Sequence, residues 1–272
     1  MSYKFNVADA TSRVIKWIQD WFEANGKNCN AVVGISGGKD SSVVAALCVA
    51  ALGKDRVIGV MMPDGEQADI SFSYMLCKHL GIKSVTVDIS NAVQGVTNGI
   101  ICGLHSNQSK FMLTGGTNPC CDFQFIISEQ TKVNLPARIR MATLYAVSQS
   151  NNGRVANTCN LSEDWVGYST RYGDAAGDFS PFAQLTSEEV VQIGDYLGLP
   201  TELTHKTPSD GLCGKTDEDN LGFTYADLNK YIRTGVIEDA DIKKKIDTMH
   251  QKNLFKLELM PSYQSGLPVV AE

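Results

Sequence analysis

The sequence predicts an α/β fold in which a doubly wound parallel β-sheet is flanked by helices. Two observations support this prediction. Short apolar runs rich in β-branched residues alternate with helical patterns along the chain, as in parallel sheets joined by right-handed crossover helices. One of these runs, residues 56–63, is apolar almost throughout, which is typical of a strand buried on both faces.

The first part of the chain supplies most of these elements. Apolar side chains recur at helical spacing between about residues 9 and 24, which predicts an amphipathic helix that Gly26 ends. A strand is then expected over residues 31–36, and a helix follows to about residue 52. Further strands are expected over 56–63 and 83–89, with a helix over 68–80 between them.

The later part of the chain is less regular. We expect a helix over 93–101, a loop or insertion over 107–128, a helix over 136–150 that begins near its proline, and a short strand over 154–157. Thr186 and Glu189 have the spacing of a capping box, which predicts the start of another helix. Residues 204–222 are expected to form a mobile functional loop, followed by helices over 224–232 and 237–253 and a C-terminal arm from 254.

The stretch 34–42, Gly-Ile-Ser-Gly-Gly-Lys-Asp-Ser-Ser, joins the first strand to the next helix. Backbone N–H groups at such a junction favour an anion, most often phosphate. Gly37 and Gly38 permit a sharp turn and a close approach of the backbone to a ligand. Asp40 would repel a phosphate unless a cation lay between them, so the stretch predicts a phosphate with a divalent metal. Neither the Walker loop nor the dinucleotide-binding fingerprint is present.

Composition excludes several classes of protein. The net charge of −6 disfavours a nucleic-acid partner bound through a general basic surface. No apolar run reaches the roughly 20 residues that span a bilayer, and the N-terminus lacks a secretory signal. The eight cysteines include no Cys-x-x-Cys pair. We therefore expect a cytoplasmic protein with reduced thiols and no membrane partner.

Ser-Gly-Gly-x-Asp-Ser at 36–41 resembles the loop of the ATP pyrophosphatases, which split ATP into AMP and pyrophosphate. Further blocks resemble the ammonia-dependent NAD synthetases, at residues 63–69, 134–141, 157–163, 167–179 and 206–225. The resemblance implies an adenine nucleotide alpha-hydrolase-like fold, with residues 1–272 as one domain and no glutaminase domain. It also implies ATP-dependent amidation of deamido-NAD to NAD with ammonia, through an NAD-adenylate, in a homodimer.

The resemblance also implies site residues. Asp40, Ser36 and Ser41 would be catalytic, and Asp40 and Glu163 would bind Mg²⁺. Contacts with ATP would come from Gly34, Ile35, Ser36, Gly37, Gly38, Lys39, Asp40, Ser41, Gln67, Thr158 and Ser209. Contacts with deamido-NAD would come from Arg138, Arg171, Asp178 and Lys256.

The sequence departs from the family's pattern at two positions. Ser187 stands where the family often has a lysine that touches ATP phosphate, so we expect that charge to come from Lys39 or Lys206. Phe255 stands where the family has a histidine.

Three other functions remain open. A GMP synthetase-like amidating enzyme shares the loop, although the Tyr-Gly-Asp block at 172–174 favours the NAD synthetases. A sulfur-inserting tRNA enzyme would require paired catalytic cysteines and a basic face, which the acidic balance disfavours. A nucleotide-binding regulator that kept only the fold is disfavoured by the intact Asp40 and Glu163.

Overall fold

A parallel four-stranded sheet forms the centre of the protein, in the order β3-β2-β1-β4. The computed structural model describes residues 3–113, 127–206, 217–258 and 261, and the side chains of all of these except 102–113. The strands are β1 (Asn30–Gly34), β2 (Val57–Met61), β3 (Lys83–Thr86) and β4 (Gly153–Val155). Ala31 of β1 lies opposite Val57 of β2 on one side and Arg154 of β4 on the other. The predicted parallel sheet is confirmed.

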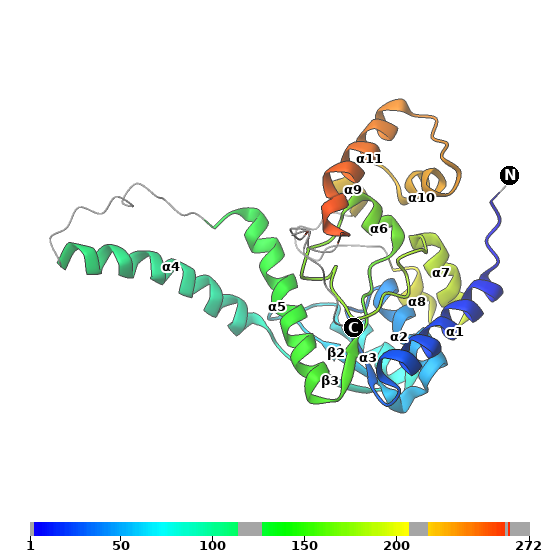
Figure 1. Cartoon of the computed structure of the whole chain (residues 1–272), viewed down its shortest axis with the longest axis horizontal. Helices are drawn as coiled ribbons and strands as arrows, with labels where there is room; N and C mark the ends of the chain where they lie inside the picture. The colour runs from blue at the N-terminus through cyan, green and yellow to red at the C-terminus, as the bar shows by residue number, and fades with distance from the viewer. Residues whose placement is uncertain (1–2, 114–126, 207–216, 259–260, 262–272) are drawn as a thin grey trace, which may run out of the picture.

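Helices cover both faces of this sheet (Figure 1). One face packs against α1 (Val7–Gly26), α2 (Lys39–Leu52), α3 (Ile70–Leu80) and α7 (Ser187–Tyr196). The other packs against α5 (Glu129–Ser150). Successive side chains of β1 point to opposite faces of the sheet. Ala31 and Val33 therefore pack in the larger core, and Val32 packs against Leu144 of α5 on the other face.

The order in which strands are added changes direction between β1 and β4: β2 and β3 lie on one side of β1, and β4 lies on the other. The chain passes from β1 to β3 through α2 and α3 on one face, then leaves the body along α4 (Ser90–Leu113) (Figure 1). It returns along α5 on the opposite face and adds β4 beside β1. In doubly wound sheets, ligands bind beyond the carboxyl ends of the strands at such a reversal. Both segments that were singled out from the sequence, 34–42 and 157–163, follow these two strands.

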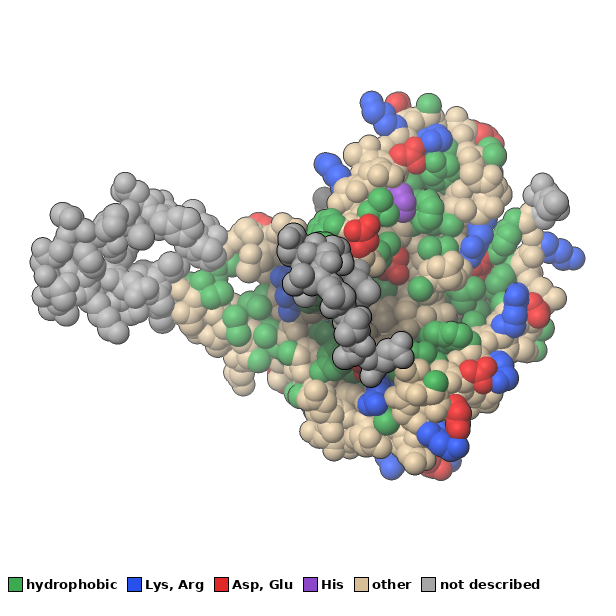
Figure 2. All heavy atoms as spheres, viewed as in Figure 1, with side chains coloured by type: hydrophobic (Ala, Val, Ile, Leu, Met, Phe, Trp, Pro, Cys, Tyr) green, Lys and Arg blue, Asp and Glu red, His purple; other side chains and the backbone are tan. Residues whose placement is uncertain are grey.

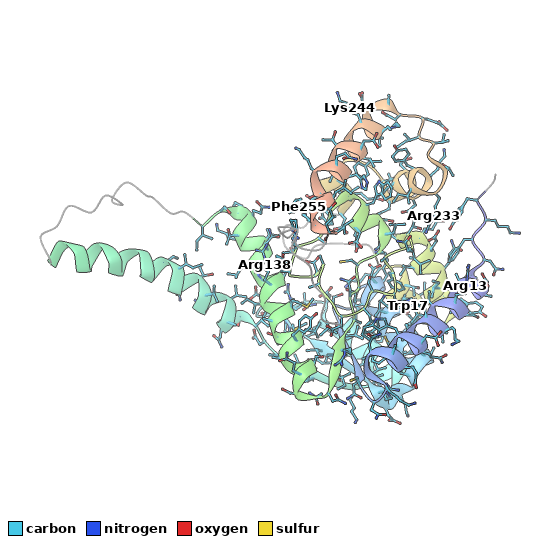
Figure 3. The ribbon with its side chains drawn as sticks, in the orientation of Figure 1. Arg13, Trp17, Arg138, Arg233, Lys244 and Phe255 are labelled. Carbon is cyan, nitrogen blue, oxygen red and sulfur yellow. The ribbon has the colours of Figure 1, made fainter. Side chains whose placement is uncertain are left out.

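A smaller lobe lies beside the sheet and has a core of its own (Figure 1). It contains α6 (Leu161–Val166), α9 (Asp217–Leu221), α10 (Tyr225–Thr234), α11 (Ala240–Asn253) and η2 (Leu254–Lys256). Short elements η1 (Lys54–Arg56) and α8 (Thr201–Thr204) complete the described part. Arg233 of α10, labelled in Figure 3, ties the lobe to α7 because its Nε donates to Glu189 Oε1 at 2.7 Å. Glu189 is only 2% exposed.

Three sequence expectations were wrong in their limits. The helix expected at 136 begins at Glu129, because Ser128 caps it by accepting a hydrogen bond from Thr131 N at 3.1 Å, and Pro136 lies inside the helix. The expected loop over 107–128 is helical to Leu113, and 114–126 lie outside the described residues. Helix α9 occupies the end of the expected 204–222 loop, of which 207–216 also lie outside. None of the described helices combines the length and apolar character that crossing a bilayer requires.

Candidate active site

The loop after β1 is a tight turn held by hydrogen bonds among its own residues. Gly37 has φ +79°, and a Cβ there would come within 3.1 Å of Ser73 N, so only glycine fits. Ser36 and Ser41 lie with their Oγ atoms 3.1 Å apart, and Ser36 Oγ accepts a hydrogen bond from Gly38 N at 3.2 Å. Gly38 is the N-cap of α2 and provides no side-chain cap. The first N–H groups of α2 are therefore available to an anion.

Asn160 brings the two predicted metal-binding acids together. It is fully buried, and its Nδ2 donates to Asp40 Oδ1 at 3.0 Å. As the N-cap of α6, its Oδ1 accepts from Ser162 N at 3.0 Å and from Glu163 N at 3.2 Å. Its own backbone N donates to Glu163 Oε2 at 3.3 Å. Asn160 is a functional candidate that the predicted site residues do not include, although Asn160 and Glu163 have capping-box spacing.

The electrostatics of this pair favour a bound cation. Burial, followed by the negative charge of Asp40, raises the pKa of Glu163 well above its usual range. Lys39 is 8% exposed, and its Nζ donates to Asp40 Oδ2 at 2.8 Å. Burial alone would lower the pKa of Lys39, but the charges of Asp40, Glu163 and Asp217 outweigh it and the pKa is raised.

The donor set fits Mg²⁺ rather than a metal held by protein ligands alone. Carboxylate oxygens are hard donors, and Mg²⁺ is commonly bound by one or two carboxylates together with substrate phosphates and water. Within the part of the chain that the structure describes, no group of three or more His, Cys, Asp or Glu side chains gathers as a metal site. Asp40 and Glu163 would thus supply two ligands, and a nucleotide could supply others.

A cavity of about 430 Å³ opens beside the loop, between Lys39 and the helices α7 and α10. Ser187 lines it and accepts a hydrogen bond from Asn229 Nδ2 at 3.2 Å, so it belongs to a buried neutral network. Lys39 and Lys206 line the same cavity. Both lysines named as possible sources of the missing positive charge therefore line the same cavity as Ser187.

The other predicted ATP contacts lie around the same edge of the sheet, where the structure describes them. Gln67 follows β2 and donates from Nε2 to Asp69 Oδ1 at 2.8 Å. Asp69 also accepts from Lys206, and that hydrogen bond is the main reason why its pKa is lowered. Thr158 follows β4 and is partly buried. Ser209 lies outside the described residues.

The predicted deamido-NAD residues fall into two groups. Arg138 of α5 and Arg171 lie together, since Arg138 Nε donates to Arg171 O at 3.3 Å. The Arg171 guanidinium lies 5.2 Å from the ring centre of Tyr172 and 5.4 Å from that of Phe255. Figure 3 shows Arg138 and Phe255 on facing sides of the space between α5 and the smaller lobe. This group can present positive charge and aromatic surface to a ligand.

The second group, Asp178 and Lys256, is bonded to the backbone. Asp178 Oδ2 accepts from Val155 N at 2.7 Å, which fixes the end of β4. Lys256 Nζ donates to Gly167 O at 2.7 Å and to Ser169 O at 3.0 Å, just beyond the C-terminal end of α6. Burial lowers the pKa of Lys256 despite the nearby Asp174. These contacts stabilise the backbone at the ends of β4 and α6.

Comparison with known proteins agrees with this geometry. Residues 10–261 match the family model described as NAD synthase. The chain is 40% identical over 213 residues to NH(3)-dependent NAD(+) synthetase of Methanococcus aeolicus, covering 77% of this chain and 75% of that one. It is 37% identical over 231 residues to NH(3)-dependent NAD(+) synthetase of Methanocaldococcus jannaschii, covering 84% and 81%.

A solved structure shares the fold over nearly the whole chain. The structure of NMN synthetase from Francisella tularensis is similar with a TM-score of 0.79 and 30% sequence identity, covering 96% of this chain and 99% of that one. The sequence match, the shared fold and the loop at the switch point all lead to one assignment: the chain belongs to the NAD synthase family.

Proposed function

We propose that the protein is a C–N ligase that amidates deamido-NAD to NAD with ammonia, converting ATP to AMP and pyrophosphate. The observation that carries the proposal is the meeting of Asp40 and Glu163 through Asn160 beside a phosphate-type loop, in a chain of this family. The GMP synthetase-like alternative is not favoured, because the curated relatives that match are NH(3)-dependent NAD(+) synthetases.

In the first step, the nicotinate carboxylate would attack the α-phosphorus of ATP, forming an adenylate and releasing pyrophosphate. The N–H groups at the start of α2 and the hydroxyls of Ser36 and Ser41 would bind the phosphate chain where negative charge develops. Asp40 and Glu163 would hold Mg²⁺, which supplies charge neutralisation for the departing pyrophosphate. Ammonia would then attack the activated carbonyl carbon, forming the C–N bond and releasing AMP and a proton.

The substrate nucleotide would bind on the side of Arg138 and Arg171. Two guanidinium groups in one region suit phosphate oxygens. Aromatic surface beside Arg171 could stack on a base or the pyridine ring. Asp178 and Lys256 would border this subsite from the end of β4 and the end of α6.

A second candidate differs only in the size of the substrate. The similar structure from Francisella tularensis is named NMN synthetase, so nicotinate mononucleotide is a competing substrate for this chain. Family membership and the loop chemistry are the same for both. A direct substrate comparison is therefore part of the test.

The test is an amidation assay with purified protein, ATP, Mg²⁺ and ammonium, with deamido-NAD or nicotinate mononucleotide as acceptor. AMP and the amide product are both quantified. We expect NAD and AMP in equal amounts, and a higher kcat/KM for deamido-NAD. No NAD above background, from protein shown to bind ATP, would contradict the proposed function. A higher kcat/KM for the mononucleotide would support the second candidate.

We also propose a homodimer formed through α4 and α5. Helix α4 extends away from the body (Figure 1), and Figure 2 shows hydrophobic side chains where α4 and α5 adjoin the body. Val96 and Ile101 of α4 are each 40% exposed, and Val133 of α5 is 50% exposed. A second copy would cover this apolar surface. Val133→Glu should shift the sedimentation coefficient toward that of a monomer, and a monomeric active wild type would contradict the proposal.

The proposed location is the cytoplasm. Cys29, Cys48, Cys77 and Cys159 are buried free thiols in the described part of the chain, as expected in a reducing compartment.

A further inference from the structure

The Asp40 carboxylate already has a partner at each oxygen. Asn160 Nδ2 donates to Oδ1 at 3.0 Å, and Lys39 Nζ donates to Oδ2 at 2.8 Å. Each oxygen has a further lone pair, so neither hydrogen bond blocks a metal by itself. A divalent cation bound to either oxygen would nevertheless lie only a few ångströms from the Lys39 ammonium. Two cations at that separation repel each other strongly in a partly buried site.

Of the two partners, Lys39 is the one that can withdraw. Asn160 is fully buried, and its other end caps α6, so it cannot turn away without breaking two backbone contacts. Lys39 has a long flexible stem that ends in a compact point charge. Its side chain lines the cavity of about 430 Å³ beside the loop. There the ring of Tyr225 has its centre 5.8 Å from Lys39 Nζ and can stabilise a cation.

We propose that Lys39 is an exchangeable internal counter-ion, which neutralises Asp40 until a divalent cation arrives with a nucleotide and then turns into the cavity to contact the phosphate chain. This role rests on the proposed ATP chemistry. Asp40 and Lys39 then each have a partner of opposite charge both before and after binding. Asp40 exchanges the ammonium for the metal, and the ammonium exchanges the carboxylate for phosphate oxygen.

Two consequences distinguish this role from that of an ordinary phosphate-binding lysine. Without nucleotide, the metal must displace Lys39 while no phosphate is present to receive the ammonium, which is left with the Tyr225 ring and the charge of Asp217. Binding of the metal alone is therefore weakened. The metal and nucleotide together provide a new partner for Lys39, so they bind cooperatively. Removal of the Lys39 charge should therefore strengthen metal binding and weaken nucleotide binding. If Lys39 only bound phosphate, its removal would weaken nucleotide binding and leave metal binding unchanged.

The experiment is a titration of the intact protein with Mn²⁺ alone, followed by electron paramagnetic resonance of the free ion. Lys39→Met should bind Mn²⁺ about ten-fold more tightly than wild type, because a neighbouring positive charge has been removed. Its affinity for Mg-ATP should fall by about ten-fold, since a charge-assisted contact is lost. Lys39→Gln, which keeps a donor near Asp40 without the charge, should follow Lys39→Met for Mn²⁺.

Two matched control variants distinguish the effect of the positive charge beside Asp40 from the effect of positive charge elsewhere in the cavity. Lys206→Met removes a cavity lysine that pairs with Asp69 and should leave Mn²⁺ affinity unchanged. Lys39→Arg keeps the charge and should retain the wild-type Mn²⁺ affinity. Wild-type or weaker Mn²⁺ binding by either folded neutral variant, Lys39→Met or Lys39→Gln, would overturn the proposal. The titration contains no acceptor nucleotide, so failure of the proposed amidation activity would not affect it.

Discussion

Asn160→Ser is the most informative substitution at this site, because it separates the two tasks of one buried side chain. Serine is as good an N-cap as asparagine, so the start of α6 is retained. The Nδ2 donor to Asp40 is lost, and with it the direct link between Asp40 and the segment that carries Glu163. We therefore expect a variant that folds but holds Asp40 less well.

The expected magnitudes follow from the contacts. Loss of one hydrogen bond to a charged group should lower the free energy of unfolding by about 1.5–3 kcal/mol. Asn160→Ala removes the cap as well and should cost about 1 kcal/mol more. If Asp40 shifts by roughly 1 Å, kcat/KM should fall on the order of 100-fold. Asn160→Asp keeps the cap acceptors but places a like charge beside Asp40, so its kcat/KM should fall at least as far.

The assay measures NAD formation against Mg²⁺ concentration, together with urea unfolding. Asn160→Ser should raise the Mg²⁺ concentration needed for half-maximal rate, because Asp40 keeps only its hydrogen bond from Lys39 and is held less well. Asn229→Ser is the matched control, since Asn229 is also a buried donor but bonds to Ser187 rather than to either acid. A wild-type Mg²⁺ requirement and kcat/KM in Asn160→Ser would refute the positioning role of Asn160.

Three further predictions follow from the same contacts. Asp40→Asn should lower AMP formation on the order of 1,000-fold with little change in the melting temperature, and near-normal turnover would remove Asp40 from the proposed metal site. The raised pKa of Glu163 means that the folded protein binds this proton more tightly, so stability without metal falls as pH rises above the usual value of 4.5. The stability of Glu163→Gln relative to wild type should thus increase from about pH 5 to pH 8 in EDTA, and a constant difference would contradict this. Arg233→Met leaves Glu189 buried without its cation and should cost about 3–5 kcal/mol in urea unfolding, whereas a loss below about 1 kcal/mol would show that the pair matters little.

The sequence predicted the central layers well because their signals are local. Strands β1 and β2 are buried, and their apolar runs needed no knowledge of the rest of the fold. The sequence predicts the start of α5 seven residues too late, because proline is typical of a first helical turn, whereas Ser128 is the actual cap and Pro136 lies inside the helix. The sequence predicts the end of α4 at residue 101, whereas the helix continues to Leu113.

The site was predictable only in part. The loop residues follow from a contiguous pattern, and the resemblance supplied Glu163. The contact between Asn160 and Asp40 joins positions 120 residues apart, so no local pattern contains it. Resemblance likewise could not reveal that Lys256 and Asp178 are held by backbone atoms. The residue type shows which side-chain groups are available for chemistry. The hydrogen-bond partner of each group depends on the folded site.

Strand β4 joins the sheet only after α4 and α5 in the order of the chain, so the proposed site is completed by a late segment of the sequence. Asp40 follows the first strand, but Asn160 and Glu163 reach it only after the chain has travelled out along α4 and back along α5. With Asp40 and Glu163 as the proposed metal ligands, a partly folded chain that lacks β4 would have only one of the two acids in place. We therefore expect ATP cleavage only after the sheet is complete. Mg-ATP would bind only the completely folded form and should therefore stabilise it. Above Kd, the free energy of unfolding should rise with the logarithm of the Mg-ATP concentration.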